Sequence, residues 1–395
     1  MATSSSLEKL RWLFVSDFLD DPNSGAAGSL RCIGEALEEL GHSVDFAWHV
    51  GDRRRLPGRF DTYFGLPRAQ MRQVREHLQR GMTEGRPFDI VTISQPYGYL
   101  AQERLASEFP TTLFTNRTHG WEARYNENQR QFGWELPQGW TNRLFRYLSQ
   151  RFMARICRRA ALSCHGFIAP ASSCARFVQE RYKVPEWRVA TIPYGLGNEF
   201  HNLPERPSRT NDSLRLLYVG QYLERKGSQI LEEHLPRLGS QFPNARLTFV
   251  VPPHLLDVLV NRYGDSWGDR LQVFPWMSRR ELIRVYQEHD IFLFPSYFEG
   301  FGKTFFEAMA CGMCVASFDD AGVGDIAQEG EALVCPVGDV PNFVKLLTEA
   351  LGGQHPVGVI GEKARRRALE FTWTKNAEQT VRFCQELRRR CLPVT

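Results

Sequence analysis

Short, nearly continuous apolar runs alternate with amphipathic segments from one end of the chain to the other. Runs of strand length without polar alternation are typical of parallel strands that helices cover on both faces. Segments such as 27–41 and 172–182 carry apolar residues at helical spacing between such runs. The predicted strands form two series, 11–18, 42–50, 88–94, 111–118, 165–171 and 188–195, then 214–222, 245–252, 271–277, 290–296, 314–319 and 332–338. The pattern predicts two doubly wound α/β domains.

The break between the two series falls at residues 198–213, a polar stretch that contains prolines and lacks periodicity. We therefore predict a first domain at 1–200 and a second domain at 201–370. Residues 371–395 follow the last predicted strand and have the pattern of a single amphipathic helix.

The composition is that of a water-soluble globular protein, with 42% hydrophobic and 24% charged residues among 395. The formal charge of +4 is too small to indicate nucleic acid as the partner. The first residues lack the pattern of a secretory signal, and no run of about 18 apolar residues predicts a membrane span. These features predict a cytoplasmic protein.

Nine cysteines are scattered along the chain, many of them inside apolar segments, which predicts reduced and buried thiols. Cys311 and Cys314 have the spacing of a redox or zinc pair. However, they close a predicted helix, and no second pair would complete a zinc site. We interpret them as small core residues.

Three predicted strand ends carry residues suited to a ligand, because ligands of open α/β sheets bind at the carboxyl ends of strands. After the first strand, Gly25 and Gly28 precede or open a helix whose N-terminus could hold a phosphate. An ordinary capped helix explains this stretch equally well. After the strand at 214–222, Arg225 and Lys226 stand before a helix opened by Gly227, where they could reach a diphosphate or form a solvated basic turn.

The third strand end is the stretch "PSYFEGFGKTFFEAMACG" at residues 295–312. Backbone N–H groups near Gly302–Thr304 lie at a predicted helix start and could hold an anion. Glu299 precedes this turn and Glu307 lies one turn inside the helix. Carboxylates would not bind a phosphate, but each could accept hydrogen bonds from hydroxyl groups on either side of one. The arrangement therefore suggests a sugar on one side and a ribose on the other.

The stretch "SYFEGFGKTFFEAMACGMCVASFDDAGVGDI" resembles the Glu-x7-Glu segment of the retaining glycosyltransferases of family 4, which have the GT-B fold. "VGQYLERKG", "VFPWMSRRELIRVYQEHDIFLFPS" and "RRAALSCHGFIAPASSCARFVQERYKVPEWRVATIPYG" are similar to other segments of that family. The resemblance covers residues 155–340, whereas the first 120 residues match only in plan and at "GAAG" and "THGWE". It implies two Rossmann-like domains that face each other across a cleft. The first would be the acceptor-side domain and the second would bind the nucleotide sugar, and the C-terminal helix would pack back on the first domain.

The resemblance implies a role for each matching residue. Glu307 would bind the ribose, Glu299 the hydroxyls of the donor sugar, and Lys226 the diphosphate, together with the backbone of Phe301, Gly302, Lys303 and Thr304. The further donor-binding positions are Gly220, Gln221, Arg225, Phe274, Trp276 and Met277 in the second domain, and Gly25 and Ala26 in the first. His119 matches a histidine that faces the donor sugar, and with Glu299 and Lys226 it forms the predicted catalytic set.

Two positions depart from the family pattern. The family usually has arginine directly after the glycine of "VG", where this chain has Gln221, so Arg225 is the candidate replacement for that charge. The glycine pair of the first domain is Gly25 and Ala26 here, which would tighten the approach of the diphosphate.

The resemblance further implies front-face transfer with retention of configuration, without metal or cofactor, from a nucleotide sugar in which UDP is favoured and GDP is next. The acceptor stays open among polysaccharides, lipid carriers, small metabolites and proteins. A sugar phosphorylase or sugar-nucleotide epimerase on the same fold, and a non-catalytic scaffold, are the alternatives.

Residues 139–162 predict a basic amphipathic helix, with Arg143, Arg146, Arg151, Arg155 and Arg158 to one side and Leu148, Phe152 and Ile156 packed on another. Its basic side is either a solvated face or a contact, with anionic lipid at the inner face of the membrane or with an acidic acceptor. Trp121, Trp134 and Trp140 could stack on a sugar acceptor or cover the core.

Overall fold

The computed structural model of the chain describes residues 8–21, 25–49, 61–135, 139–204, 206, 213–320 and 322–393. Residues 1–126, 137–195 and 373–395 form one compact unit, and residues 127–136 and 196–372 form a second. The sequence placed 127–136 in the first domain, whereas these residues cluster with the second unit. Residues 205 and 207–212, within the predicted break, lie outside the described residues.

The first unit is built on a parallel sheet of six strands in the order β2-β1-β3-β4-β5-β6. The strands are β1 (Arg11–Val15), β2 (Ser43–Ala47), β3 (Ile90–Ser94), β4 (Leu113–Arg117), β5 (Gly166–Ala169) and β6 (Val189–Thr191). The helices are α1 (Gly25–Glu39), α2 (Leu66–Thr83), α3 (Tyr99–Glu108), α4 (Glu122–Phe132), α5 (Trp140–Ser163), α6 (Ser172–Tyr182) and α15 (Trp373–Cys391). The last residues of α4 belong to the second unit.

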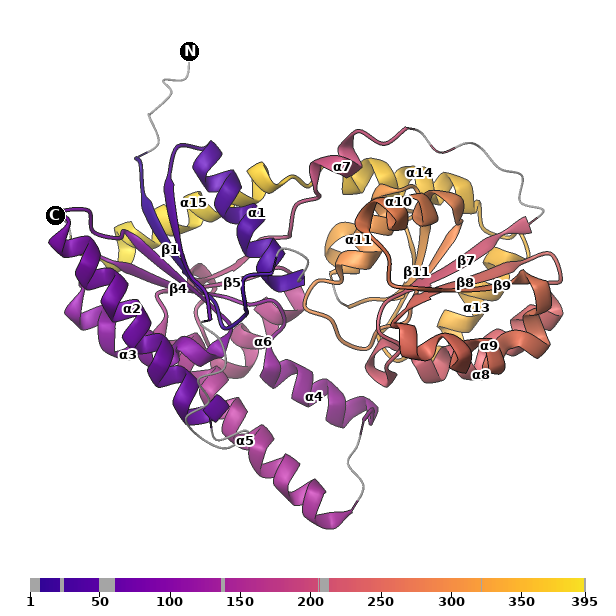
Figure 1. Cartoon of the computed structure of the whole chain (residues 1–395), viewed down its shortest axis with the longest axis horizontal. Helices are drawn as coiled ribbons and strands as arrows, with labels where there is room; N and C mark the ends of the chain where they lie inside the picture. The colour runs from indigo at the N-terminus through magenta and orange to yellow at the C-terminus, as the bar shows by residue number, and fades with distance from the viewer. Residues whose placement is uncertain are drawn as a thin grey trace. The chain divides into compact units, whose positions relative to one another are not determined.

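The second unit has a parallel sheet of six strands in the order β12-β11-β10-β7-β8-β9 (Figure 1). The strands are β7 (Arg215–Val219), β8 (Arg246–Val251), β9 (Leu271–Pro275), β10 (Ile291–Phe294), β11 (Cys314–Phe318) and β12 (Leu333–Cys335). The helices are α7 (Asn198–His201), α8 (Ser228–Gln241), α9 (Leu256–Trp267), α10 (Arg279–Glu288), α11 (Lys303–Ala310), α12 (Val323–Ile326), α13 (Val340–Leu351) and α14 (Val357–Ala368).

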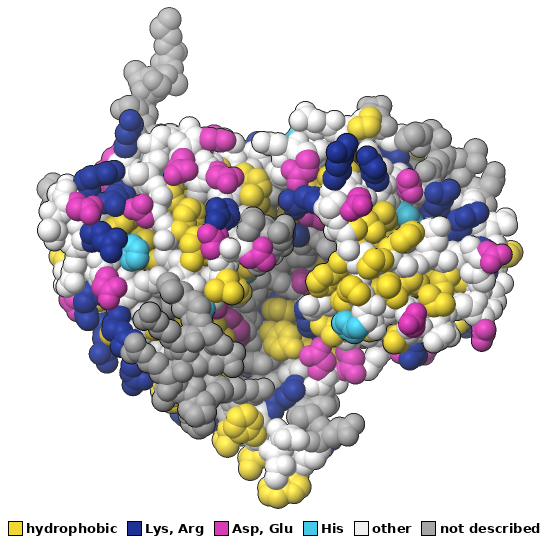
Figure 2. All heavy atoms as spheres, viewed as in Figure 1, with side chains coloured by type: hydrophobic (Ala, Val, Ile, Leu, Met, Phe, Trp, Pro, Cys, Tyr) yellow, Lys and Arg dark blue, Asp and Glu magenta, His cyan; other side chains and the backbone are white. Residues whose placement is uncertain are grey.

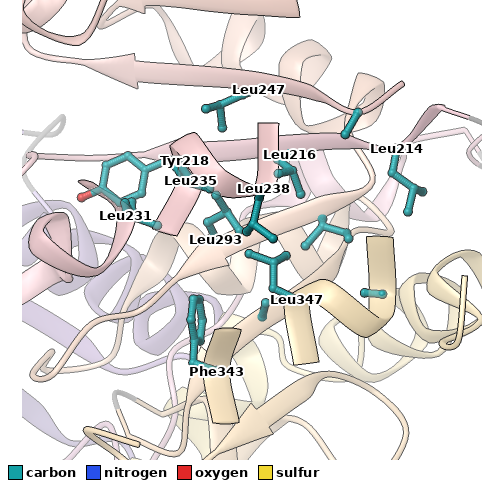
Figure 3. Close-up of a cluster of buried hydrophobic side chains, with 14 of the residues drawn as sticks. Leu214, Leu216, Tyr218, Leu231, Leu235, Leu238, Leu247, Leu293, Phe343 and Leu347 are labelled. Carbon is teal, nitrogen blue, oxygen red and sulfur yellow. The ribbon is translucent and has the colours of Figure 1, made fainter. Parts of the chain in front are cut away.

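All twelve predicted strands are present, and the fold prediction is confirmed in both units. The inner strands are buried along nearly their whole length, because helices cover both faces of each sheet. Figure 3 shows one such layer in the second unit, where Leu216 and Leu247 of the sheet meet Leu231, Leu238 and other side chains of the covering helices.

The C-terminal helix α15 packs against the first sheet, as predicted. Its buried face shares a core cluster with Trp12 of β1 and Leu30 of α1. The buried Arg117 of β4 donates through Nη2 to Thr380 Oγ1 at 2.7 Å. The chain therefore returns to its first unit after completing the second.

Candidate functional site

The candidate donor site lies where β7 and β10 run side by side. The strands after β7 are added on one side of it and those from β10 onward on the other, so the order reverses between these two neighbours. In open α/β sheets, ligands bind outside the carboxyl ends of the strands at such a reversal. The loop after β7 carries Gly220 to Lys226, and the loop after β10 carries Glu299.

Two basic side chains from the first loop meet one carboxylate from the second. Lys226 Nζ lies 2.6 Å from Glu299 Oε1, and Arg225 Nη1 lies 3.6 Å from the same oxygen. All three side chains are largely buried, with 14 to 21% of their surface exposed. Partly buried charges interact more strongly than fully solvated ones, because water screens them less. The structure thus brings together three predicted site residues from segments about 75 residues apart in sequence.

A backbone hydrogen bond and a close backbone approach fix the positions of the two loops relative to each other. Tyr297 N donates to Arg225 O at 2.9 Å. Gly227 has φ +78°, and a Cβ built there would lie 2.4 Å from Pro295 O. The β7 loop therefore approaches the β10 loop more closely than any side chain at residue 227 would permit.

Replacing Gly227 with alanine should lower the free energy of unfolding by about 2–4 kcal/mol, because the methyl group adds a clash to an unfavourable backbone angle. Urea titration followed by circular dichroism would measure the loss. Gly264→Ala in α9 is the matched control, since no atom lies within 4 Å of its Cβ position. That change should be neutral or stabilising by about 0.5–1 kcal/mol. Equal effects of the two substitutions would contradict the close approach.

Glu307, one turn inside α11, is held from two sides. The residue is 8% exposed. Arg279 Nη2 donates to its Oε1 at 2.8 Å, and Tyr286 OH donates to its Oε2 at 3.5 Å. Burial and the neighbouring Glu307 carboxylate raise the pKa of Tyr286 well above its usual value, so that hydroxyl stays a donor. This pre-orients the carboxylate.

Arg279 and Tyr286 were not among the predicted site residues. Both lie on α10, within the block that resembles the family, but a helix of alternating charges does not reveal which charge points inward. Arg279 also places Nη1 3.0 Å from Glu199 Oε1 on α7. The arginine thereby links the candidate ribose ligand to the short helix that follows residue 197.

The turn before α11 is a helix start capped by glycine, and helix starts of this kind can bind an anion. Gly302 is the N-cap, with φ +76°, and a Cβ there would lie 2.7 Å from Phe294 Cζ. The side chain of Phe301 is buried, so only its backbone can face a ligand. Lys303 and Thr304 begin the helix, where N–H groups have no acceptor within the helix itself.

The predicted base-binding residues lie at the end of the outer strand β9. Phe274 and Trp276 are 37% and 55% exposed, and Met277 is partly exposed. Ser278 then caps α10 with a capping box, so Arg279 is the first residue of that helix. Arg279, which contacts Glu307, thus follows this aromatic segment directly in the chain.

Gly220 and Gln221 mark the end of β7. Gly220 has φ +143°, and its Cβ position would be 3.6 Å from Lys226 Nζ. Gln221 has an exposed side chain, and its carbonyl oxygen accepts from Tyr218 OH at 2.8 Å. The backbone at residue 221 is thus anchored. Arg225, the candidate replacement for the family's arginine, lies with Lys226 at the carboxylate of Glu299.

Residues 127–135 support both loops of the donor site, which the sequence did not predict. The rings of Phe132 and Trp134 lie 5.0 and 5.7 Å from that of Tyr297, and Asn128 Nδ2 donates to Tyr297 O at 3.1 Å. Glu135 N donates to the carboxylate of Glu224, next to Arg225. Trp134 is therefore a core residue of the second unit rather than an exposed stacking platform.

In the first unit, the predicted residues lie at the carboxyl edge of the sheet. His119 follows β4, its Nδ1 is hydrogen-bonded to Tyr194 OH, and its ring meets that of Phe18 edge-on at 5.9 Å. Gly25 and Ala26 open α1. Trp121 is fully buried against Phe167 and so belongs to the core.

The turn before His119 is fixed by polar contacts. Thr118 Oγ1 donates to Gln95 Oε1 at 3.1 Å and accepts from Gly120 N at 3.0 Å. Gln95 has φ +63°, an unfavourable angle for a residue with a side chain. Backbone strain of this kind is often found at functional sites. The strain at Gln95, which follows β3 and contacts Thr118, therefore marks this edge of the sheet independently of the sequence resemblance.

Asp17, at the end of β1, is a titratable group that no motif singled out. Burial raises the pKa of its carboxyl to about 7. Burial and the charge of Asp17 also raise the pKa of Glu122 well above its usual value. Burial thus shifts both carboxyls toward the protonated form, in which each can donate a hydrogen bond.

The stability that Asp17 contributes should fall as the pH rises from about 4 to 7, because the unfolded chain ionises first while the folded chain resists. Asp17→Asn removes this cost. The free energy of unfolding of the variant should therefore rise relative to that of wild type across this range, by up to about 4 kcal/mol for three pH units. Urea midpoints at pH 5, 6.5 and 8 would measure the gain. A stability difference independent of pH would show that Asp17 does not titrate in this range.

The remaining chemical features concern metals, thiols and membranes. Among residues that the structure describes, no three His, Cys, Asp or Glu side chains converge as a metal site requires. Cys311 and Cys314 are buried, as predicted, and burial raises the pKa of Cys314 to about 12. None of the described helices combines the length and apolar character needed to cross a membrane.

Solved structures with the same fold span nearly the whole chain. Sucrose-phosphate synthase from Thermosynechococcus elongatus superimposes with a TM-score of 0.72 at 19% identity, over 96% of this chain and 100% of that one. HepE of Anabaena, in complex with UDP, superimposes with a TM-score of 0.63 at 14% identity, over 94% and 99%. These likenesses establish the fold.

D-inositol 3-phosphate glycosyltransferase 2 of Catenulispora acidiphila is 26% identical over 220 residues, which is 51% of this chain and 51% of that protein. The chain spans about half the length of the curated relatives it matches. Residues 23–197 match the model of Glycosyltransferase Family 4, and residues 200–367 match that of Glycosyl transferases group 1. With both halves matched and two six-stranded parallel sheets present, the chain belongs to the GT-B glycosyltransferases that combine these two domains.

Proposed function

We propose that the protein transfers a sugar from a nucleoside-diphosphate sugar to a hydroxyl acceptor, with retention of the anomeric configuration. The observation that carries the proposal is the convergence of Lys226 and Arg225 on Glu299 where β7 and β10 meet. Glu307 lies eight residues beyond Glu299, one turn inside α11. One segment therefore offers a carboxylate on each side of an anion-binding turn.

In this proposal, the protein accelerates the reaction by stabilising the charge that develops in the transition state. As the bond between the sugar and the diphosphate breaks, negative charge grows on the leaving oxygen. Lys226, Arg225 and the N-terminus of α11 would stabilise that charge. Glu307 would accept hydrogen bonds from ribose hydroxyls, and Glu299 from hydroxyls of the sugar. His119, which Tyr194 orients, would contact the donor sugar from the first unit.

Retention would follow from front-face transfer, in which the departing phosphate oxygen takes the proton of the acceptor hydroxyl as the new bond forms. This route needs no protein carboxylate as nucleophile, unlike retaining glycosidases. Nuclear magnetic resonance of the product should show the anomer of the donor, and inversion would overturn the mechanism. The nucleotide sugar is the substrate and no cofactor or metal is proposed, so EDTA should leave the activity unchanged.

The donor base is proposed to be uracil, with guanine next, and HepE, which shares the fold, was solved with UDP. The test is a thermal-shift screen against UDP, GDP, ADP and their common sugar conjugates. A nucleotide present at about 100 times its Kd should stabilise the folded protein by about 2.7 kcal/mol. The nucleotide that binds would then identify the sugar conjugates for transfer assays.

The thermal-shift screen and the transfer assays together separate the alternatives. Turnover that requires inorganic phosphate would indicate a phosphorylase, and conversion of the sugar nucleotide without an acceptor would indicate an epimerase. Stabilisation by none of the nucleotides would favour the scaffold. The names of the relatives do not select an acceptor for this chain, so the acceptor is proposed only as a hydroxyl compound.

A further inference from the structure

The first turns of α5 expose a cluster of large apolar side chains. Trp140, Leu144, Tyr147 and Leu148 are 77, 51, 47 and 56% exposed. Residues at spacings of four, seven and eight share one side of a helix. We call this side the exposed arc of α5. In Figure 1 this end of α5 extends away from the sheet of the first unit, and Figure 2 shows hydrophobic side chains gathered at that tip.

The exposed arc continues into arginines. Arg151, Arg155 and Arg158 follow on the same side and are all exposed. Arg151 Nη1 donates to Tyr147 OH at 2.7 Å, which joins the apolar part of the arc to the basic part. The whole helix contains six arginines and no acidic residue. The arc is therefore apolar at one end and cationic at the other.

The opposite side of α5 is packed, so the exposed arc is presented by an anchored helix. Met153, Ile156 and Cys157 are buried in the core of the first unit. Phe152 contacts Tyr63 and Phe64 at ring distances of 5.0 and 5.1 Å. The sequence predicted that Leu148 would pack beside Phe152 and Ile156, and this prediction is wrong. Leu148 is exposed and lies on the exposed arc, eight residues from Trp140.

We propose that the exposed arc docks on a membrane surface that contains anionic lipid. Trp140, Leu144 and Leu148 would enter the boundary between headgroups and acyl chains. Tryptophan and tyrosine favour that layer because their rings are apolar with a polar edge. Arg151, Arg155 and Arg158 would meet lipid phosphates. Charge complementarity favours this partner, since α5 offers only positive charge. The inference does not depend on the proposed function.

The test is cosedimentation of the full chain with vesicles of phosphatidylcholine alone and of phosphatidylcholine with about one third phosphatidylglycerol. Wild type should bind the anionic vesicles, and more weakly as salt is added. Replacing the three arginines of the arc with glutamine should weaken that binding about 100-fold, at roughly fivefold for each charge. Leu144→Ser with Leu148→Ser should weaken it at least about 10-fold.

The matched control is Val258→Ser with Val260→Ser on α9, two apolar residues of similar exposure outside the arc. This variant should bind like wild type, and circular dichroism should show that all variants are folded. Absence of vesicle binding by wild type would overturn the proposal. So would equal binding to both vesicle types, or a dimer in light scattering that the two leucine substitutions dissociate, because a second copy would then cover the arc.

Discussion

Replacing Lys226 with alanine is expected to lower kcat about 100- to 1,000-fold, while the protein stays folded. Lys226 Nζ is the closest cation to Glu299, at 2.6 Å, and 14% of its side chain is exposed. A charge that stabilises the leaving group mainly in the transition state contributes about 3–4 kcal/mol. Because such a contact is weaker in the ground state, kcat should fall more than KM rises. Steady-state kinetics with the sugar nucleotide found in the thermal-shift screen would measure both.

Two controls separate this role from a structural ion pair. Lys226→Arg keeps the positive charge and should retain activity within about 10-fold of wild type. Arg225→Ala removes the more distant cation, at 3.6 Å from Glu299, and should have a smaller effect than Lys226→Ala. Should Lys226→Ala instead reduce thermal stability while kcat stays within about threefold, the lysine would serve folding alone.

Replacing Glu307 with glutamine is expected to weaken UDP binding about 10- to 100-fold. The substitution keeps the size of the side chain and removes the charge that two ribose hydroxyls would use. A hydrogen bond to a charged group is worth about 1.5–3 kcal/mol. Isothermal titration calorimetry would give the Kd, and 2′-deoxy-UDP provides the matching change in the ligand. Wild type should bind 2′-deoxy-UDP more weakly than UDP, whereas Glu307→Gln should bind the two compounds with similar affinity.

Arg279 allows a second comparison at the same carboxylate. Arg279→Gln should weaken UDP binding by about 3- to 10-fold, because it releases Glu307 from an ion pair that is partly exposed on the arginine side. Glu199→Gln removes a second carboxylate that contacts Arg279, at 3.0 Å, and should leave the affinity unchanged. An increase in affinity in Arg279→Gln would mean that the arginine competes with the nucleotide for Glu307.

Much of this protein is determined by local sequence. Parallel strands buried on both faces must be apolar along their length, so all twelve could be located from short windows. The turn before α11 is equally local, since Gly302 at φ +76° is the type of residue that such a helix start requires. Lys226 and Glu299 could be proposed because each follows a strand end, and Glu307 because it lies one turn inside the next helix.

The tertiary structure decided which of these pieces meet. The segment 127–135 has the same helical pattern whichever sheet it supports, and only its packing on Tyr297 assigns it to the second unit. Arg279 was one of several arginines on a charged helix until the order of β10 and β7 brought α10 to Glu307. Whether the Leu148 side chain is exposed depends on how α5 is rotated about its axis when it packs on the first unit. Periodicity in the sequence indicates which side chains tend to be buried. Strand order and helix packing determine which residues those side chains contact, because the contacts join residues far apart in sequence.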